Sequence, residues 1–101
     1  MSGFSLASAG PGRLAASGEL GFATATVALA AGLKHIVAGE PVVVDLQGVT
    51  AGDSAGLAVL VEWLSVARAR NARLSYESVP RQILALARTS GLDELLLVQP
   101  A

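Results

Sequence analysis

Ser54 is the residue of this sequence whose type and neighbours come nearest to those of a catalytic group. It follows Asp53 in the stretch Asp53-Ser54-Ala55-Gly56-Leu57, after an apolar segment. A serine nucleophile needs a general base within hydrogen-bond reach. The one histidine, His35, lies in a different predicted helix, and Ser54 lacks the Gly-x-Ser-x-Gly pattern of a nucleophile elbow. The stretch therefore gives little support for nucleophilic catalysis.

The other ionisable groups are equally isolated. None of the eight Asp and Glu residues forms a recognised acid/base motif. Asp45 and Asp53 could approach each other, because one ends a predicted strand and the other starts a predicted helix, although plain roles as strand end and helix cap also suit them. Because cysteine is absent and His35 stands alone, we expect no metal site.

Nucleotide-binding motifs are also missing from the sequence. Gly10 and Gly12 lie between two predicted strands, and no Gly-Lys-Ser or Gly-Lys-Thr follows them. The P-loop and the Rossmann fingerprint are therefore both absent. We expect no enzyme activity and no cofactor.

Composition indicates a globular protein that binds a partner. Of the 101 residues, 52% are hydrophobic and only 15% are charged, so some apolar surface is expected to meet another protein. The net charge of −1 and the lack of a dense Lys/Arg run argue against nucleic-acid binding. The apolar run Phe22–Leu33 is too short for a membrane span, which needs about 20 residues. The start of the sequence does not resemble a signal peptide, so we expect a soluble cytoplasmic protein forming one domain, 1–101.

The order of the predicted elements is β-β-α-β-α-β-α. Periodicity and turn residues predict a hairpin of Phe4–Ala9 and Arg13–Leu20, a helix Thr24–Val37, a strand Pro41–Leu46, a loop Gln47–Asp53, a helix Ser54–Arg70, a strand Arg73–Glu77 and a helix Pro80–Thr89. The tail Leu92–Val98 could be a helical turn, a short strand, or both in succession. With right-handed crossovers, this order predicts a two-layer α/β sandwich: a mixed four- or five-stranded sheet with helices on one side.

The start of the helix after Asp53 has two interpretations. Asp53, and less effectively Ser54, can accept hydrogen bonds from the first free N–H groups of the helix. The same helix end tolerates a phosphate on Ser54, whose charge would repel a docked partner. Gly56 would allow another backbone to approach closely.

The same helix has more apolar residues than one sheet contact requires. Val59, Trp63 and Val66 lie on an arc beside the main apolar stripe. They could pack under the N-terminal hairpin or a terminal segment. Alternatively, they form a docking face with Trp63 as its anchor, since interfaces favour Trp.

The segment Val42–Pro80 resembles the centre of a STAS domain, the fold of anti-sigma-factor antagonists and of the cytoplasmic tails of sulfate transporters. The likeness consists of an apolar strand ending in Asp45, a short loop, and then Asp53-Ser54-Ala55-Gly56-Leu57. Ser17–Leu20, with the sequence SGEL, is similar to the end of the second family strand. The resemblance implies a STAS-like (anti-sigma-factor antagonist-like) fold over nearly the whole chain.

Two segments are most similar to one branch of this family, the small MlaB subunit of the Mla phospholipid transporter: Leu60–Leu64 and Pro80–Leu96. This resemblance implies a non-catalytic subunit that binds and regulates the cytoplasmic ATPase of an ABC transporter, which maintains the lipid asymmetry of the outer membrane. It also implies a location beside the inner membrane, held there by the partner. The alternative is an anti-sigma-factor antagonist in which a partner serine kinase phosphorylates Ser54. Family positions and the face argument together nominate six partner-binding residues: Asp53, Ser54, Gly56, Leu57, Val59 and Trp63.

Overall fold

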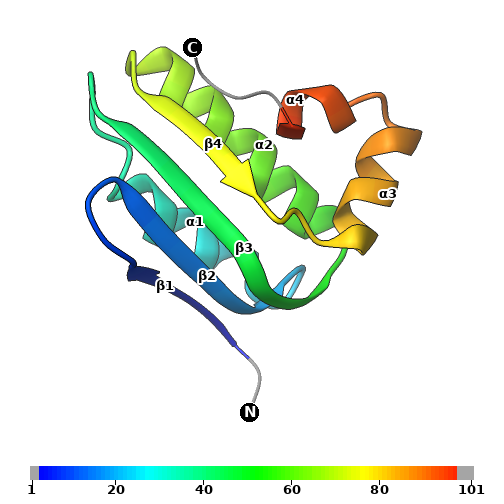
Figure 1. The fold of residues 1–101 in the computed structure, drawn as a ribbon. Helices are drawn as coiled ribbons and strands as arrows, with labels where there is room; N and C mark the ends of the chain where they lie inside the picture. The colour runs from blue at the N-terminus through cyan, green and yellow to red at the C-terminus, as the bar shows by residue number, and fades with distance from the viewer. Residues whose placement is uncertain (1–2, 98–101) are drawn as a thin grey trace.

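The elements follow the order expected from the sequence, with one additional short helix at the end. A computed structural model describes residues 3–97, and this part of the chain forms four strands and four helices (Figure 1). Their bounds are β1 Phe4–Ser8, β2 Arg13–Leu20, α1 Ala25–Leu33, β3 Pro41–Gly52, α2 Ser54–Ala69, β4 Arg73–Glu77, α3 Arg81–Thr89 and α4 Asp93–Leu97. The helical alternative for the tail is confirmed, apart from Val98, which lies outside the described residues.

The sheet is mixed, and its strands are arranged in the order β1-β2-β3-β4. β1 and β2 form the predicted antiparallel hairpin, with Gly10 and Gly12 at positive φ in its turn. β2 pairs with β3, and β3 with β4, in parallel. The predicted α/β fold with a mixed sheet is therefore confirmed.

β3 is longer than the sequence suggested. The expected loop Gln47–Asp53 is wrong, because the strand continues to Gly52 and its second half pairs with the end of β2. Gly48 permits this pairing, since a Cβ there would lie 2.7 Å from the Ala16 carbonyl oxygen. The strand thus runs without interruption to the residue before Asp53.

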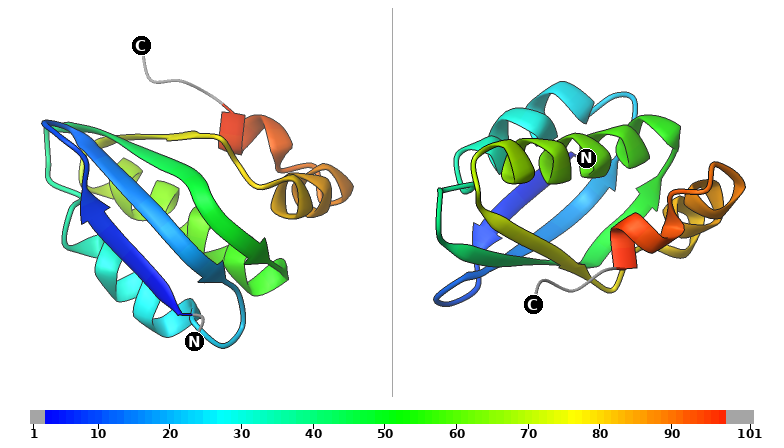
Figure 2. Two further views of the ribbon diagram at one scale, coloured as in Figure 1. Left: turned by 60° about the horizontal axis from the view of Figure 1, so that its bottom comes forward. Right: turned by 90° about the horizontal axis from the view of Figure 1, so that it is seen from above.

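Two helices, α1 and α2, cover one face of the sheet (Figure 2). The side chains of the strands that point toward them are buried, as alternation along a half-covered strand requires. The resulting core combines Leu14, Ala16, Val42, Val44, Leu46, Leu74 and Tyr76 of the sheet with Leu60, Trp63 and Ala67 of α2. Position and orientation of α2 are therefore fixed by apolar packing along most of its length.

α1 is shorter than the predicted helix Thr24–Val37. It ends at Leu33, and the next turn is held by the side chain of Arg70 at the end of α2. The Arg70 Nη1 atom donates to the carbonyl oxygens of Leu33 and Ile36, at 3.0 Å each. The Leu33 carbonyl is one of the last groups that α1 leaves without an intrahelical partner, and the bond to Ile36 holds the turn that follows.

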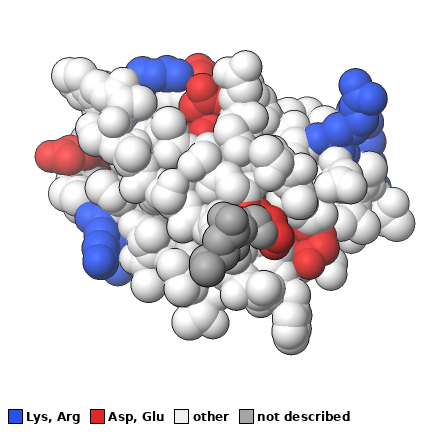
Figure 3. Space-filling model, turned by 90° about the horizontal axis from the view of Figure 1, so that it is seen from below, with Lys and Arg blue, Asp and Glu red and all other residues white. Residues whose placement is uncertain are grey.

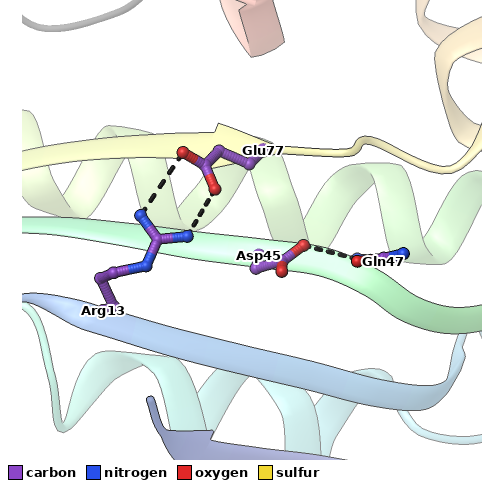
Figure 4. A network of polar contacts seen from close by, with 4 residues as sticks. All are labelled: Arg13, Asp45, Gln47 and Glu77. Atoms are coloured by element: carbon purple, nitrogen blue, oxygen red, sulfur yellow. Dashed lines mark hydrogen bonds and ion pairs between the residues drawn. The ribbon is translucent and has the colours of Figure 1, made fainter. Parts of the chain in front are cut away.

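The opposite face of the sheet carries polar side chains (Figure 4). The guanidinium of Arg13 on β2 reaches over β3 to Glu77 on β4, with Nη2 at 2.5 Å from Oε1. Asp45 lies on β3, between those two strands, and accepts a hydrogen bond from the Gln47 N–H group at 2.9 Å. Asp45 is thus in mid-strand, separated from Asp53 by an extended segment of roughly 25 Å. The expectation that these two aspartates could form a dyad is wrong.

The last two helices lie beside β4 and not over the sheet (Figures 1 and 2). α3 starts at Arg81 with Pro80 as its N-cap, one residue later than predicted. It buries Ile83 and Ala87, and α4 buries Leu96. The α3–α4 segment closes the side of the core next to β4.

Candidate interaction site at the start of α2

Asp53 connects the first turn of α2 to the loop between β2 and α1 through one carboxylate. Its Oδ1 atom accepts hydrogen bonds from the N–H groups of Ala55, at 2.9 Å, and Gly56, at 3.2 Å. Its Oδ2 atom accepts a third hydrogen bond, at 3.1 Å, from the N–H group of Phe22 in the loop between β2 and α1. The prediction that Asp53 caps α2 is confirmed, and the bond to Phe22 adds a contact that the sequence did not suggest.

These hydrogen bonds also set the protonation state of Asp53. The Phe22 N–H group, followed by that of Gly56, lowers the pKa of the Asp53 carboxyl below its usual value, against an opposing effect of desolvation. A carboxylate that accepts several backbone N–H bonds is stabilised in its charged form. Asp53 therefore carries a negative charge at neutral pH.

Ser54 is the first residue of α2, and its side chain faces solvent. Within residues 3–97 its hydroxyl group has no hydrogen-bond partner, because Asp53 supplies the cap. The hydroxyl is thus accessible at the positive end of the helix dipole, where a phosphate group is tolerated. Phosphorylation of Ser54 stays a prediction.

Gly56 approaches another backbone closely, as predicted, but the neighbour belongs to the same chain. A Cβ on Gly56 would overlap the carbonyl oxygen of Leu20 at the end of β2. Leu57 and Val59 are also buried in the core. These three residues are buried within this chain and support the start of α2 from inside, and their nomination as partner-binding residues stays a prediction.

The side chain of Trp63, on α2, fills the space between α1 and the sheet. Its side chain is only 1% exposed, and its indole N–H group donates to the Leu29 carbonyl oxygen at 3.2 Å. The ring lies 6.3 Å from that of Phe4 and 6.5 Å from that of Tyr76. Gly32 of α1 makes room for it, since a Cβ there would overlap the indole. The prediction of an exposed Trp63 anchor is wrong, and packing under the hairpin is correct.

The large exposed apolar side chain of this region is instead Phe22, which is 86% exposed. The sequence alone did not single out Phe22, which was considered only as the first residue of an apolar run, Phe22–Leu33, too short for a membrane span. A usable signal was present: Gly21 follows a strand, and Thr24 is a residue type that closes turns. These residues indicate a turn whose second position points outward.

Two open depressions border the start of α2. One, of about 340 Å³, lies between the ends of β2 and β3 and includes Glu19, Phe22 and Asp53. The other, of about 360 Å³, lies between α1 and α2 and includes Ala58 and Glu62. Figure 3 shows the end of the molecule where β2 and β3 end: most of its surface is uncharged, and Lys and Arg lie near the outline.

The described part of the chain gives no sign of a metal site or a membrane span. Residues 3–97 contain no group of three or more His, Cys, Asp or Glu side chains placed to hold a metal ion. Over the same residues, no helix has the length and hydropathy needed to cross a membrane.

Two similar solved structures are those of much larger transporter chains. "The overall structure of SLC26A9" aligns with a TM-score of 0.64 at 16% identity, covering 81% of this chain and 16% of that chain. The murine Solute Carrier 26 family member A9 anion transporter, in its inward-facing state, aligns with a TM-score of 0.65 at 16% identity, covering 83% and 14%. At this identity the likeness concerns the fold alone, and the chain spans only about one-sixth or less of either transporter.

The sequence comparisons are more specific about family. A search of the curated proteins found no match. The family model described as "Mlab, STAS domain" matches residues 6–99, nearly the whole chain. The fold agrees with that match, since it combines a mixed four-stranded sheet with helices and places the Asp53-Ser54 pair at the start of α2. The chain therefore belongs to the STAS domain family, in the group described as Mlab.

Proposed function

We propose that this protein is a non-catalytic STAS subunit that binds and regulates the cytoplasmic ATPase of an ABC phospholipid transporter. In this role it would contribute to maintaining the lipid asymmetry of the outer membrane. The observation that carries the proposal is the Mlab family match over residues 6–99. STAS domains generally lack catalysis and typically act through contacts with partners.

The geometry at the start of α2 supports this function. Asp53 satisfies the first N–H groups of the helix, so the adjacent Ser54 hydroxyl is left available to a partner. Beneath it, Gly56, Leu57 and Val59 fix the helix on the end of β2 and on the core. A partner would therefore meet a preformed surface, which lowers the entropy cost of binding.

The subunit would regulate the ATPase by binding to it through this surface. In the proposed complex the subunit stabilises the assembled form of the ATPase and itself carries out no chemical step. It would lie in the cytoplasm, beside the inner membrane, held there by the ATPase and its membrane permease.

Affinity purification of the tagged chain from native membranes tests this proposal. We expect the ABC ATPase and its permease to copurify with the wild-type chain. Ser54→Glu should reduce recovery, because its longer side chain would sterically keep a closely packed partner away from the exposed first residue of α2. Ser54→Thr retains the hydroxyl and is the matched control. A preparation that contains the folded wild-type chain and no ATPase would contradict the proposal.

A second candidate function is that of an anti-sigma-factor antagonist controlled by phosphorylation of Ser54. The exposed, unpaired Ser54 hydroxyl directly after the cap residue favours it. Incubation with candidate serine kinases and ATP, followed by intact-mass measurement, would give one added phosphate in the wild-type chain and none in Ser54→Ala. Capture of an anti-sigma factor instead of an ATPase would favour this second function.

A further inference from the structure

Phe22 lies at the tip of a turn that is closed by its own hydrogen bonds. The Thr24 N–H group donates to the Gly21 carbonyl oxygen at 3.0 Å, which makes Gly21–Thr24 a β-turn with Phe22 at its second position. The Thr24 hydroxyl also accepts from the Gly21 N–H group at 3.1 Å and donates to the Glu19 carbonyl oxygen at 2.9 Å. The backbone that carries Phe22 is therefore well defined.

Asp53 fixes the same turn from the side of α2. Its Oδ2 atom accepts from the Phe22 N–H group, and this contact depends on glycine at position 21. A Cβ on Gly21 would lie 2.7 Å from that oxygen atom. Asp53 is thus a positioning residue for Phe22 as well as the cap of α2.

An exposed aromatic ring on a fixed turn has the properties of a binding anchor. Burial of an aromatic side chain removes a large apolar area from water, and aromatic residues are enriched in interfaces. Because the turn is already ordered, binding would sacrifice little backbone freedom. The ring itself contributes nothing to the core of this chain, since it is 86% exposed.

The charges around Phe22 indicate what kind of surface it meets. Among residues 3–97, the charged side chains that line the two depressions beside the start of α2 are Glu19, Asp53 and Glu62. All three are acidic. A complementary partner surface would carry Lys or Arg around an apolar pocket.

From this geometry we propose that Phe22 is the hydrophobic anchor by which the chain binds its protein partner, and that the partner supplies an apolar pocket edged by basic residues. The inference rests on the proposed function in taking the ABC ATPase as that partner. It adds the β2–α1 turn to the interaction surface and assigns the anchor role to Phe22 in place of Trp63.

Titration of the ATPase subunit with purified variants tests the anchor. Phe22→Ala should weaken binding about tenfold or more, as truncation of a central interface residue does. Val37→Ala is the matched control, because Val37 is also an exposed apolar residue (47%) and lies after the other end of α1. It should leave the affinity within about twofold of wild type. Circular dichroism and thermal unfolding should show both variants folded like the wild type.

Two further measurements address the positioning role and the charges. Gly21→Ala should displace the Asp53 carboxylate, weaken binding, and raise the pKa of Asp53 toward its usual value in an NMR titration. Glu62→Lys should weaken binding to the ATPase. In a separate titration of the wild-type chain, added salt should also weaken binding, because salt screens the attraction between oppositely charged surfaces.

The outcomes separate this inference from the proposed function. If the wild-type chain binds the ATPase and Phe22→Ala binds it with the same affinity, Phe22 is not the anchor, and the proposed function is unaffected. Absence of wild-type binding to the ATPase would overturn both. Loss of a wild-type dimer on Phe22→Ala in sedimentation would show that a second copy is the occupant. Loss of cosedimentation with anionic phospholipid vesicles would show that lipid is the occupant, and either result would overturn the proposal of a protein pocket.

Discussion

The first turn of α2 and its middle turn differ in what holds them in place. In the first turn, Asp53 accepts three backbone N–H groups, and Ser54 projects into solvent. In the middle turn, Leu60 and Trp63 are buried beneath α1 and the sheet. Both turns belong to one stretch that resembles a docking motif in sequence. Polar contacts therefore shape the surface of this helix, whereas its apolar residues support that surface from within.

Trp63→Ala should destabilise the fold more than any other substitution considered in α2. The substitution leaves a cavity between α1 and the sheet and removes the hydrogen bond to Leu29, so we expect a loss of about 3–5 kcal/mol in the free energy of unfolding. Urea denaturation followed by circular dichroism measures it. A variant with wild-type stability and impaired partner binding would mean that Trp63 is a docking residue after all.

Gly56→Ala tests whether the first turn rests on the end of β2. A methyl group would overlap the Leu20 carbonyl oxygen, and the backbone must shift to accommodate it. We expect a loss of about 1–3 kcal/mol in the free energy of unfolding, measured by the same denaturation. Ser65→Ala, at an exposed position of α2, is the control and should cost nothing. Equal stability of the two variants would contradict the close contact.

The charge of Asp53 predicts a specific pH dependence. Because its pKa is lowered in the folded chain, the stabilising contribution of this carboxylate is complete above the usual Asp pKa of about 3.9 and is lost as the pH falls through the lower folded-state value. Asp53→Asn keeps a capping oxygen without the charge. The difference in Tm between wild type and Asp53→Asn should therefore be constant from about pH 5 to 7 and shrink below about pH 4. A difference that persists in acid would show that the charge is not involved.

Ser54→Glu should have the smallest effect on the fold itself. The side chain is exposed at the positive end of the helix dipole, so the change in the free energy of unfolding should stay below about 1 kcal/mol. Chemical denaturation measures this change, with Ser54→Ala as a control measured in parallel. A large destabilisation would mean that Ser54 helps to hold the helix in place. The first turn of α2 would then not present a surface residue independent of the fold.

The order of the elements could be predicted because local patterns determine it. Alternation, the Gly10-Pro11-Gly12 turn and the apolar stripe of α2 each need only a few neighbouring residues. The predicted ends of β3 and α1 were wrong because residues far away in the sequence determine where these elements end. β3 continues through Gly48 by pairing with β2, and the turn after α1 is held by hydrogen bonds from Arg70, the C-cap residue of α2, to the carbonyl oxygens of Leu33 and Ile36.

The candidate site was predictable only in part, for the same reason. The cap at Asp53 is a local feature, and the sequence identified it. The burial of Trp63 depends on Gly32, which lies 31 residues earlier and gives the indole its space. The bond between Asp53 and Phe22 likewise joins residues 31 positions apart. A helical pattern in one segment contains no information about such contacts.

The position of α4 beside β4 affects how this protein can assemble. An uncovered strand at the side of a sheet offers unpaired backbone groups to which a strand from another molecule can add. The α4 helix, with Leu96 buried, occupies the region next to β4. Within residues 3–97, the edge of the sheet without a neighbouring helix of this kind is β1, which is only five residues long. Assembly through the helices and loops leaves the sheet unchanged, so a complex formed in that way can come apart again without rearrangement of the backbone.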